Sequence, residues 1–251
     1  MPQGFRNRTS AFSYSFLPPG VKWLLISNTA VFLVYYLASG TALERHMTAL
    51  FALSAEGAIR TFMVWQIFTY MFLHGGILHI LFNMLTLWMF GMPLEGAWGT
   101  RRFLKYYFYC GFAAAVCVLV VNMAIGDWDV PTIGASGAIF GLLVAFGVLY
   151  PNQIVLMMFL FPIKAKYMVM IYAAIELIVT FRPNTGVSTI AHLGGMAFGY
   201  LYLKGRLPSI RLPDVRGAWR QWKLQRAKRK FQVYMRKHGG RGPGGSGPFV
   251  N

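Results

Sequence analysis

One serine in this 251-residue chain stands between glycines at the start of an apolar run, in the segment Gly134-Ala135-Ser136-Gly137. Glycine allows a second backbone or a substrate to come close, and the N-terminus of a helix offers free N–H groups that stabilise a developing oxyanion. These residues therefore predict a nucleophilic hydroxyl in a hydrophobic environment. Small residues around a serine also form contact faces between membrane helices, so packing is the alternative for this motif taken alone.

A histidine in the last apolar run is the predicted partner of Ser136. Pro151 should end the helix that begins at Ser136 after about 14 residues, or about 21 Å. His192 lies 11 residues before Leu203, where its own run ends, so the two side chains should lie at similar depth. A neutral imidazole there could deprotonate the hydroxyl, the activation that a serine nucleophile needs. A structural hydrogen bond to another helix is the alternative for a lone intramembrane histidine.

Small residues repeat every fourth position on both of these helices. Gly137 and Gly141 lie beside Ser136, and Gly195 and Gly199 lie on the same helical face as His192. Two such faces allow close contact between the helices, which would bring the imidazole next to the hydroxyl.

A third polar group lies in the run from His74 to Asn83. His79 and Asn83 are four residues apart, so they share a helical face, and both can donate hydrogen bonds. With the amide of Ser136 they could form an oxyanion hole. A metal site is the competing interpretation, but no carboxylate or cysteine accompanies these histidines at ligand spacing. We therefore predict no metal and no cofactor.

The elements that must position these residues are membrane helices. Hydrophobic residues make up 56% of the chain and charged residues 12%, which indicates an all-α polytopic membrane protein. The apolar windows predict six spans, at Val21 to Ala38, Ile77 to Phe90, Phe103 to Ile125, Ile133 to Tyr150, Tyr167 to Phe181 and Val187 to Leu203. The aromatic-rich segment between the first two spans, Ser39 to Gly76, is expected to lie in the membrane interface.

Basic residues beside the spans predict the orientation. They fall on one side if both termini are cytoplasmic, and they include Arg6, Arg8, Lys22, Arg101, Arg102, Lys105, Lys164 and Lys166. We expect a cytoplasmic segment at 1–20, a membrane domain at 21–203 and a basic cytoplasmic tail at 204–251. The tail predicts an interfacial helix on anionic lipid, then a disordered Gly-rich end from Gly239 to Pro248.

The formal charge of +17 is explained by this topology and by anionic lipid, without nucleic acid. A bacterial plasma membrane is the expected location. The Arg and Ser content of residues 1–20 leaves an organellar transit peptide as an alternative.

Together the three motifs resemble the rhomboid family of intramembrane serine proteases. The run from Gly134 to Gly141 resembles the family's GxSGxxxG element, Ala191 to Gly199 its AHxxGxxxG element, and His79 to Asn83 its HxxxN element. The three occur in family order, and the resemblance covers roughly Val21 to Leu203. It implies a compact bundle of six helices around a water-filled cavity, with transmembrane helices as substrates.

The resemblance also implies roles for single residues. Ser136 and His192 would form a catalytic dyad without an acid, while His79 and Asn83 would hold the oxyanion. Gly134 would keep the approach open, and His74 would lie at the mouth of the same helix. Phe140 would stack on the imidazole where the family often has Tyr. The pair Trp65-Gln66 stands where the family often has Trp-Arg, which puts the anchoring of that loop in doubt.

Other functions remain as alternatives. The acids near the site, Asp127, Asp129 and Glu176, are not at a spacing that demands a catalytic triad. A catalytically inactive relative that binds transmembrane helices as a chaperone or dislocation factor would share the fold. A transporter or channel should show ionisable pairs at the midplane, whereas Glu176 is the only acid within the predicted spans.

Overall fold

The computed structural model describes residues 17–157, 160–181, 186–205, 223–231 and 233–234. The chain divides into two compact units, Met1–Leu207 and Pro208–Asn251. The first unit is a helical bundle, and the described part of the second unit is a helix at residues 223–231 and 233–234. The predicted N-terminal segment up to residue 16 and the predicted disordered end from Gly239 to Pro248 lie outside the described residues.

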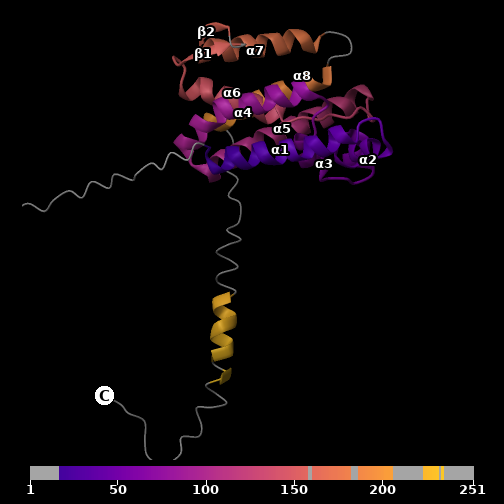
Figure 1. Ribbon diagram of the computed structural model, residues 1–251, viewed down its shortest axis with the longest axis vertical. Coiled ribbons are helices and arrows are strands. Elements are labelled where there is room, and N and C mark those ends of the chain that lie inside the picture. The colour runs from indigo at the N-terminus through magenta and orange to yellow at the C-terminus, as the bar shows by residue number, and fades with distance from the viewer. Residues whose placement is uncertain (1–16, 158–159, 182–185, 206–222, 232, 235–251) are drawn as a thin grey trace, which may run out of the picture. The chain divides into compact units, whose positions relative to one another are not determined.

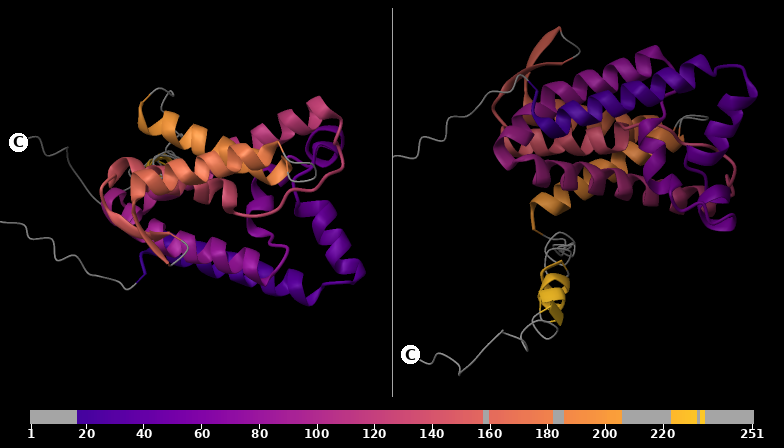
Figure 2. Two further views of the ribbon diagram at one scale, coloured as in Figure 1. Left: turned by 90° about the horizontal axis from the view of Figure 1, so that it is seen from above. Right: turned by 60° about the horizontal axis from the view of Figure 1, so that its bottom comes forward.

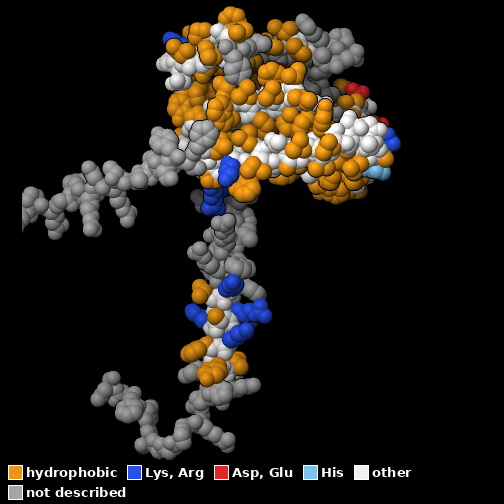
Figure 3. All heavy atoms as spheres, viewed as in Figure 1, with side chains coloured by type: hydrophobic (Ala, Val, Ile, Leu, Met, Phe, Trp, Pro, Cys, Tyr) orange, Lys and Arg blue, Asp and Glu red, His pale blue; other side chains and the backbone are white. Residues whose placement is uncertain are grey.

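Six long helices form most of the described part of the first unit (Figure 1), namely α1 (Pro19–Leu37), α4 (Ile77–Trp98), α5 (Thr100–Ile125), α6 (Ser136–Leu149), α7 (Ala165–Thr180) and α8 (Gly186–Leu203). Each predicted span overlaps one of them. Among the described residues, α1, α4 and α5 are long and apolar enough to cross a membrane, and α6 is apolar but has only 14 residues. Hydrophobic side chains cover most of the visible face of this unit, with charged ones at its margins (Figure 3). This is an integral membrane protein.

The helix α6 lies inside the bundle. It packs against α4, α5, α7 and α8. The indigo α1 and the purple α4 lie side by side at an edge of the bundle (Figure 2). Ten of its fourteen residues are buried, so little of the helix that carries Ser136 faces the outside.

Glycines set the spacing between α6 and α8, as their repeats predict. A Cβ built on Gly195 would overlap the carbonyl oxygen of Gly137, and one built on Gly199 would lie 3.3 Å from the Cα of Gly141. Tyr106 of α5 donates a hydrogen bond of 2.8 Å to the carbonyl oxygen of Gly141. The backbones of the two helices are therefore in direct contact.

The helix α4 is longer than the apolar window Ile77 to Phe90 predicts. It continues through Pro93 to Trp98, and α5 begins two residues later. The extension places Glu95 against the start of α1, where its carboxylate accepts the N–H groups of Gly20 at 2.8 Å and Val21 at 2.7 Å. A helix N-terminus has free N–H groups and a positive dipole end, which explains why a buried carboxylate is stable there.

The segment between α1 and α4 contains four short helices, α2 (Ala42–Phe51), the π-helix η1 (Glu56–Arg60), α3 (Gln66–Thr69) and the 3₁₀ helix η2 (Tyr70–Phe72). Gln66 anchors it. Its side-chain N–H donates to the carbonyl oxygen of Ala49 at 2.9 Å, and its side-chain oxygen accepts the N–H of Ser54 at 3.3 Å. The side chain is only 1% exposed. In this chain the hydrogen bonds of Gln66 hold the loop, at the position where the rhomboid-type motif often has Arg.

A two-stranded antiparallel hairpin joins α6 to α7, which the all-α prediction did not include. It consists of β1 (Ile154–Met157) and β2 (Phe161–Lys164), with Ile154 opposite Lys164. Pro151 ends the preceding helix, and the apolar run that follows it, Ile154 to Phe161, is only eight residues long before Pro162 interrupts it. Extended chain with backbone pairing satisfies the polar groups that a helix would otherwise satisfy there.

Candidate active site

Ser136 is the first residue of α6, and the segment before it is tied to the loop that follows α1. Leu53 and Thr132 exchange two backbone hydrogen bonds of 2.9 and 2.8 Å, and the N–H of Gly134 donates to the carbonyl oxygen of Tyr70 at 2.9 Å. Gly134 has a φ of +122°, a conformation that glycine adopts without strain. These bonds fix the direction in which the chain enters α6, and thus where the hydroxyl lies.

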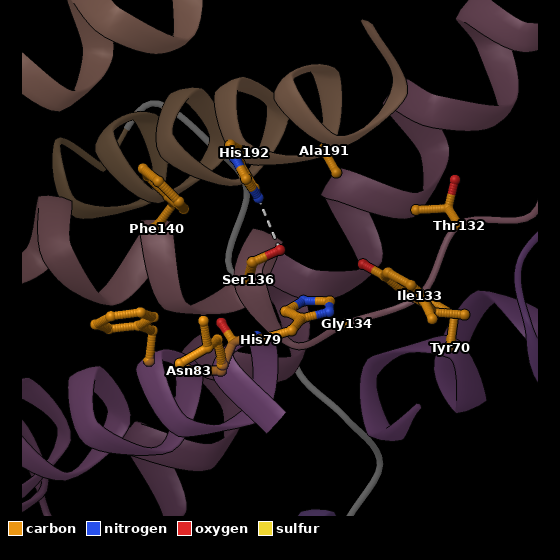
Figure 4. Close-up of a pocket in the computed structure, with 12 residues that line it drawn as sticks. Tyr70, His79, Asn83, Thr132, Ile133, Gly134, Ser136, Phe140, Ala191 and His192 are labelled. Carbon is orange, nitrogen blue, oxygen red and sulfur yellow. Dashed lines mark hydrogen bonds between the residues drawn. The ribbon is translucent and has the colours of Figure 1, made fainter. Parts of the chain in front are cut away.

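His192 of α8 reaches this hydroxyl. Its Nε2 lies 2.7 Å from the Oγ of Ser136, within hydrogen-bond distance, and the two residues are 56 positions apart in the sequence (Figure 4). The distance is at the short end of the range in which an imidazole can accept a hydroxyl proton. The structure thus brings together the two residues that the motifs predict as a pair.

Phe140, one turn after Ser136, covers one face of the imidazole. The two rings are stacked, with centroids 4.2 Å apart and an interplanar angle of 17°. Tyr172 of α7 meets the edge of Phe140 at 6.1 Å and 84°. Phe140 therefore provides the stacking surface expected of it, and the contact with Tyr172 holds that surface in place.

His79 and Asn83 of α4 line the same cavity, which has a volume of about 390 Å³ (Figure 4). The Nδ1 of His79 accepts a long hydrogen bond of 3.4 Å from the N–H of Gly75, so in the neutral ring Nε2 carries the proton. A Cβ at Gly134 would lie only 2.7 Å from this Nε2. The Nδ2 of Asn83 is buried and has no hydrogen-bond partner among the described residues.

His74 lies three residues before the first residue of α4, at the mouth of the helix. It is buried, does not line the cavity, and its ring lies 5.0 Å from that of His79 in an edge-to-face contact. The pKa of His74 is lowered from 6.5 to about 4, mainly by burial and also by the charge of His79, while the carbonyl of Phe72 opposes the shift. His74 is therefore neutral near pH 7, and its ring packs against that of His79.

Sequence reasoning missed the contact between Glu176 and the imidazole. An oxygen of this α7 carboxylate, Oε1, lies 3.0 Å from the Nδ1 of His192, although the pair is not aligned as a hydrogen bond. One signal was available, because an isolated carboxylate in an apolar span marks a functional site by default. Within the described residues, no group of three or more His, Cys, Asp or Glu side chains is arranged to hold a metal ion.

Comparison with known proteins identifies the family of this chain. The Rhomboid domain family model matches residues 61–208, more than half of the chain and all of the residues that form the cavity. The chain belongs to the rhomboid family. The matched region begins before α3 and runs past the end of α8.

Relatives of this rhomboid protein occur in plants and bacteria. RHOMBOID-like protein 1 of Arabidopsis thaliana is 33% identical over 60% of this chain and 36% of its own length. The putative rhomboid protease YdcA of Bacillus subtilis is 31% identical over 55% of this chain and 64% of its own. Rhomboid protease GluP of the same bacterium is 34% identical over 54% of this chain and 25% of its own. The chain thus covers less than two thirds of each of these relatives.

Proposed function

We propose that this rhomboid protein is an intramembrane serine endopeptidase that hydrolyses peptide bonds in or near transmembrane helices of membrane-protein substrates. The observation that carries the proposal is the 2.7 Å approach of His192 Nε2 to Ser136 Oγ. It is supported by the cavity at that point and by the two Bacillus subtilis relatives that are named as proteases.

The reaction would proceed by acyl transfer. As Ser136 Oγ attacks the peptide carbonyl carbon, His192 Nε2 takes the hydroxyl proton and later gives it to the leaving amine when the C–N bond breaks. Water then hydrolyses the acyl ester with the same imidazole as base. The oxyanion would be held by the amide of Ser136, His79 Nε2–H and the unpartnered Nδ2 of Asn83. Each such donor typically stabilises the transition state by about 3 kcal/mol.

All six long helices would cross the membrane, with the end that carries Ser136 facing away from the cytoplasm. Lys and Arg gather where α1 starts, where α4 meets α5 and around the hairpin, at Lys22, Arg101, Arg102, Lys105, Lys164 and Lys166. The opposite loops carry Arg45 and Arg60 but also Glu44, Glu56, Asp127 and Asp129. The positive-inside rule then gives cytoplasmic termini.

Ser136 would lie below the outer surface of the membrane. With 14 residues, α6 is about 21 Å long, shorter than a hydrocarbon core of about 30 Å. The cavity, whose lining includes polar side chains such as Asn83 and Thr132, would admit the water that hydrolysis needs. A substrate helix would have to unwind there, because its peptide bonds are otherwise shielded by their own hydrogen bonds.

Two segments would lie at the membrane surface. Between α1 and α4, several large side chains are exposed, namely those of Phe51, Phe62, Trp65 and Phe68, as is typical of the interface. The helix at 223–231 carries exposed basic residues together with exposed Leu224 and Phe231. It would bind anionic lipid at the cytoplasmic face.

Covalent labelling by a fluorophosphonate probe tests the activity without a known substrate. Labelling of purified protein in detergent should be lost in Ser136→Ala and His192→Ala. It should persist in the matched controls Ser39→Ala and His46→Ala, which alter exposed residues before α2 and within it. Folded wild-type protein that takes up no label would favour the rival function, an inactive rhomboid-like protein that binds transmembrane helices.

A further inference from the structure

Glu176 faces the catalytic imidazole from a helix whose neighbouring side chains point outward. Ile175, Leu177 and Ile178 are 47%, 53% and 61% exposed, as expected for residues that contact lipid. The side chain of Glu176 is only 14% exposed, and that of His192 only 16%. The carboxylate is thus turned from the outer surface of α7 toward α8.

Within the part of the chain that the structure describes, the carboxylate of Glu176 has one close polar neighbour, the imidazole of His192. Oε1 lies 3.0 Å from His192 Nδ1, and Oε2 has no hydrogen-bond partner among the described residues. A buried carboxylate without full hydrogen bonding destabilises the folded protein. Glu176 therefore contributes little to the stability of the bundle. Its effect should fall on the imidazole of His192, which is its close polar neighbour among the described residues.

Two contacts together restrict the imidazole ring. Phe140 stacks on its face at 4.2 Å, which sets the plane of the ring. Glu176 Oε1 lies 3.0 Å from Nδ1 without the alignment of a hydrogen bond, and its negative charge at this distance favours the tautomer with the proton on Nδ1. The lone pair of Nε2 is then directed at the hydroxyl of Ser136, 2.7 Å away.

We propose that Glu176 is a positioning residue that holds His192 in its catalytic orientation and stabilises the imidazolium formed during acyl transfer; this rests on the proposed protease function. When Oγ bonds to the acyl carbon, its proton moves to Nε2 and the ring becomes positive. The charge then lies next to the carboxylate, which keeps Nδ1–H oriented and takes no proton itself. The proton leaves again from Nε2 to the departing amine.

The test compares the kinetics of fluorophosphonate labelling in Glu176→Gln and wild-type protein. The probe is small, so its half-saturating concentration reports access to the cavity and its saturating rate reports activation of Ser136. Glu56→Gln is the matched control, because it makes the same change at an exposed ion pair with Arg60. We expect a saturating rate at least tenfold lower for Glu176→Gln, with an unchanged half-saturating concentration, and no effect of Glu56→Gln. Loss of the acid in a Ser-His-Asp protease lowers kcat by about 10⁴.

Glu176→Asp keeps the charge but shortens the side chain, so its rate should lie between those of Gln and wild type. If Glu176→Gln does not fold, the rate of Glu176→Asp relative to wild type decides the question. A saturating rate equal to wild type in the folded variants overturns the inference, while loss of labelling in Ser136→Ala still supports the protease. Absence of labelling in wild type removes both.

Discussion

Replacing Gly195 by Ala should separate α6 from α8 and disturb the dyad. The new Cβ would lie 2.8 Å from the carbonyl carbon of Gly137 and closer still to its oxygen, whereas ordinary contact begins at 3.4 Å. Both neighbours are backbone, so rotation of a side chain cannot relieve the overlap, and the helices must move apart by roughly 1 Å. A misplacement of this size can lower a catalytic rate about 10²-fold. We also expect the free energy of unfolding to fall by about 1–3 kcal/mol.

The assay is the saturating rate of fluorophosphonate labelling, measured well below the melting temperature so that only folded protein is compared. Gly96→Ala is the matched control, because Gly96 is in α4 and a Cβ there would meet nothing within 4 Å. That change should leave the rate unaltered and stabilise the helix by about 0.5–1 kcal/mol. Wild-type labelling and stability in Gly195→Ala would refute the idea that backbone contact between α6 and α8 sets the distance from Ser136 to His192.

Three further outcomes follow from the geometry. Asn83→Ala should lower the saturating labelling rate about 10²-fold without loss of melting temperature, because Nδ2 has no partner to lose among the described residues. Gln66→Ala should lower the free energy of unfolding by about 2–3 kcal/mol, since it leaves the backbone groups of Ala49 and Ser54 unpaired. The pKa of His74 is lowered from 6.5 to about 4, so the unfolded chain binds more protons between these values. Stability measured by denaturation should therefore fall as pH drops from 6.5 toward 4, by about 3 kcal/mol, and His74→Phe should remove that loss.

The positions of the helices could be predicted because apolar runs and helix breakers act locally. Pro151 limits α6 to Leu149, as expected. The glycine repeats also predict which faces of α6 and α8 meet, because only glycine permits such contact. The end of α4 could not be found in this way, since it depends on a distant interaction, the acceptance by Glu95 of N–H groups from α1.

The candidate site also contains features that local sequence signals predict and features that depend on interactions between distant segments. Depth alone brings Ser136 and His192 to one level, since it depends only on the rise per residue of each helix. The contact of Glu176 with His192 depends instead on the rotation of α7 about its axis and on its crossing with α8. The burial of His74 likewise depends on how the loop before α4, of which it is part, packs against the bundle. Neither the contact of Glu176 nor the burial of His74 can be predicted from the spacing of residues within one segment.

The two most buried carboxylates of the helical bundle illustrate how similar residues come to have different consequences. Both oxygens of Glu95 accept hydrogen bonds, from two backbone N–H groups of α1 and from the hydroxyl of Thr100 at 2.6 Å. Its desolvation is offset by neutral donors, so its effect is to join helices. Glu176 has no such set among the described residues and lies instead against an imidazole. Its interaction would be strongest with the imidazolium formed in the proposed acyl transfer, so Glu95 should govern stability and Glu176 the rate.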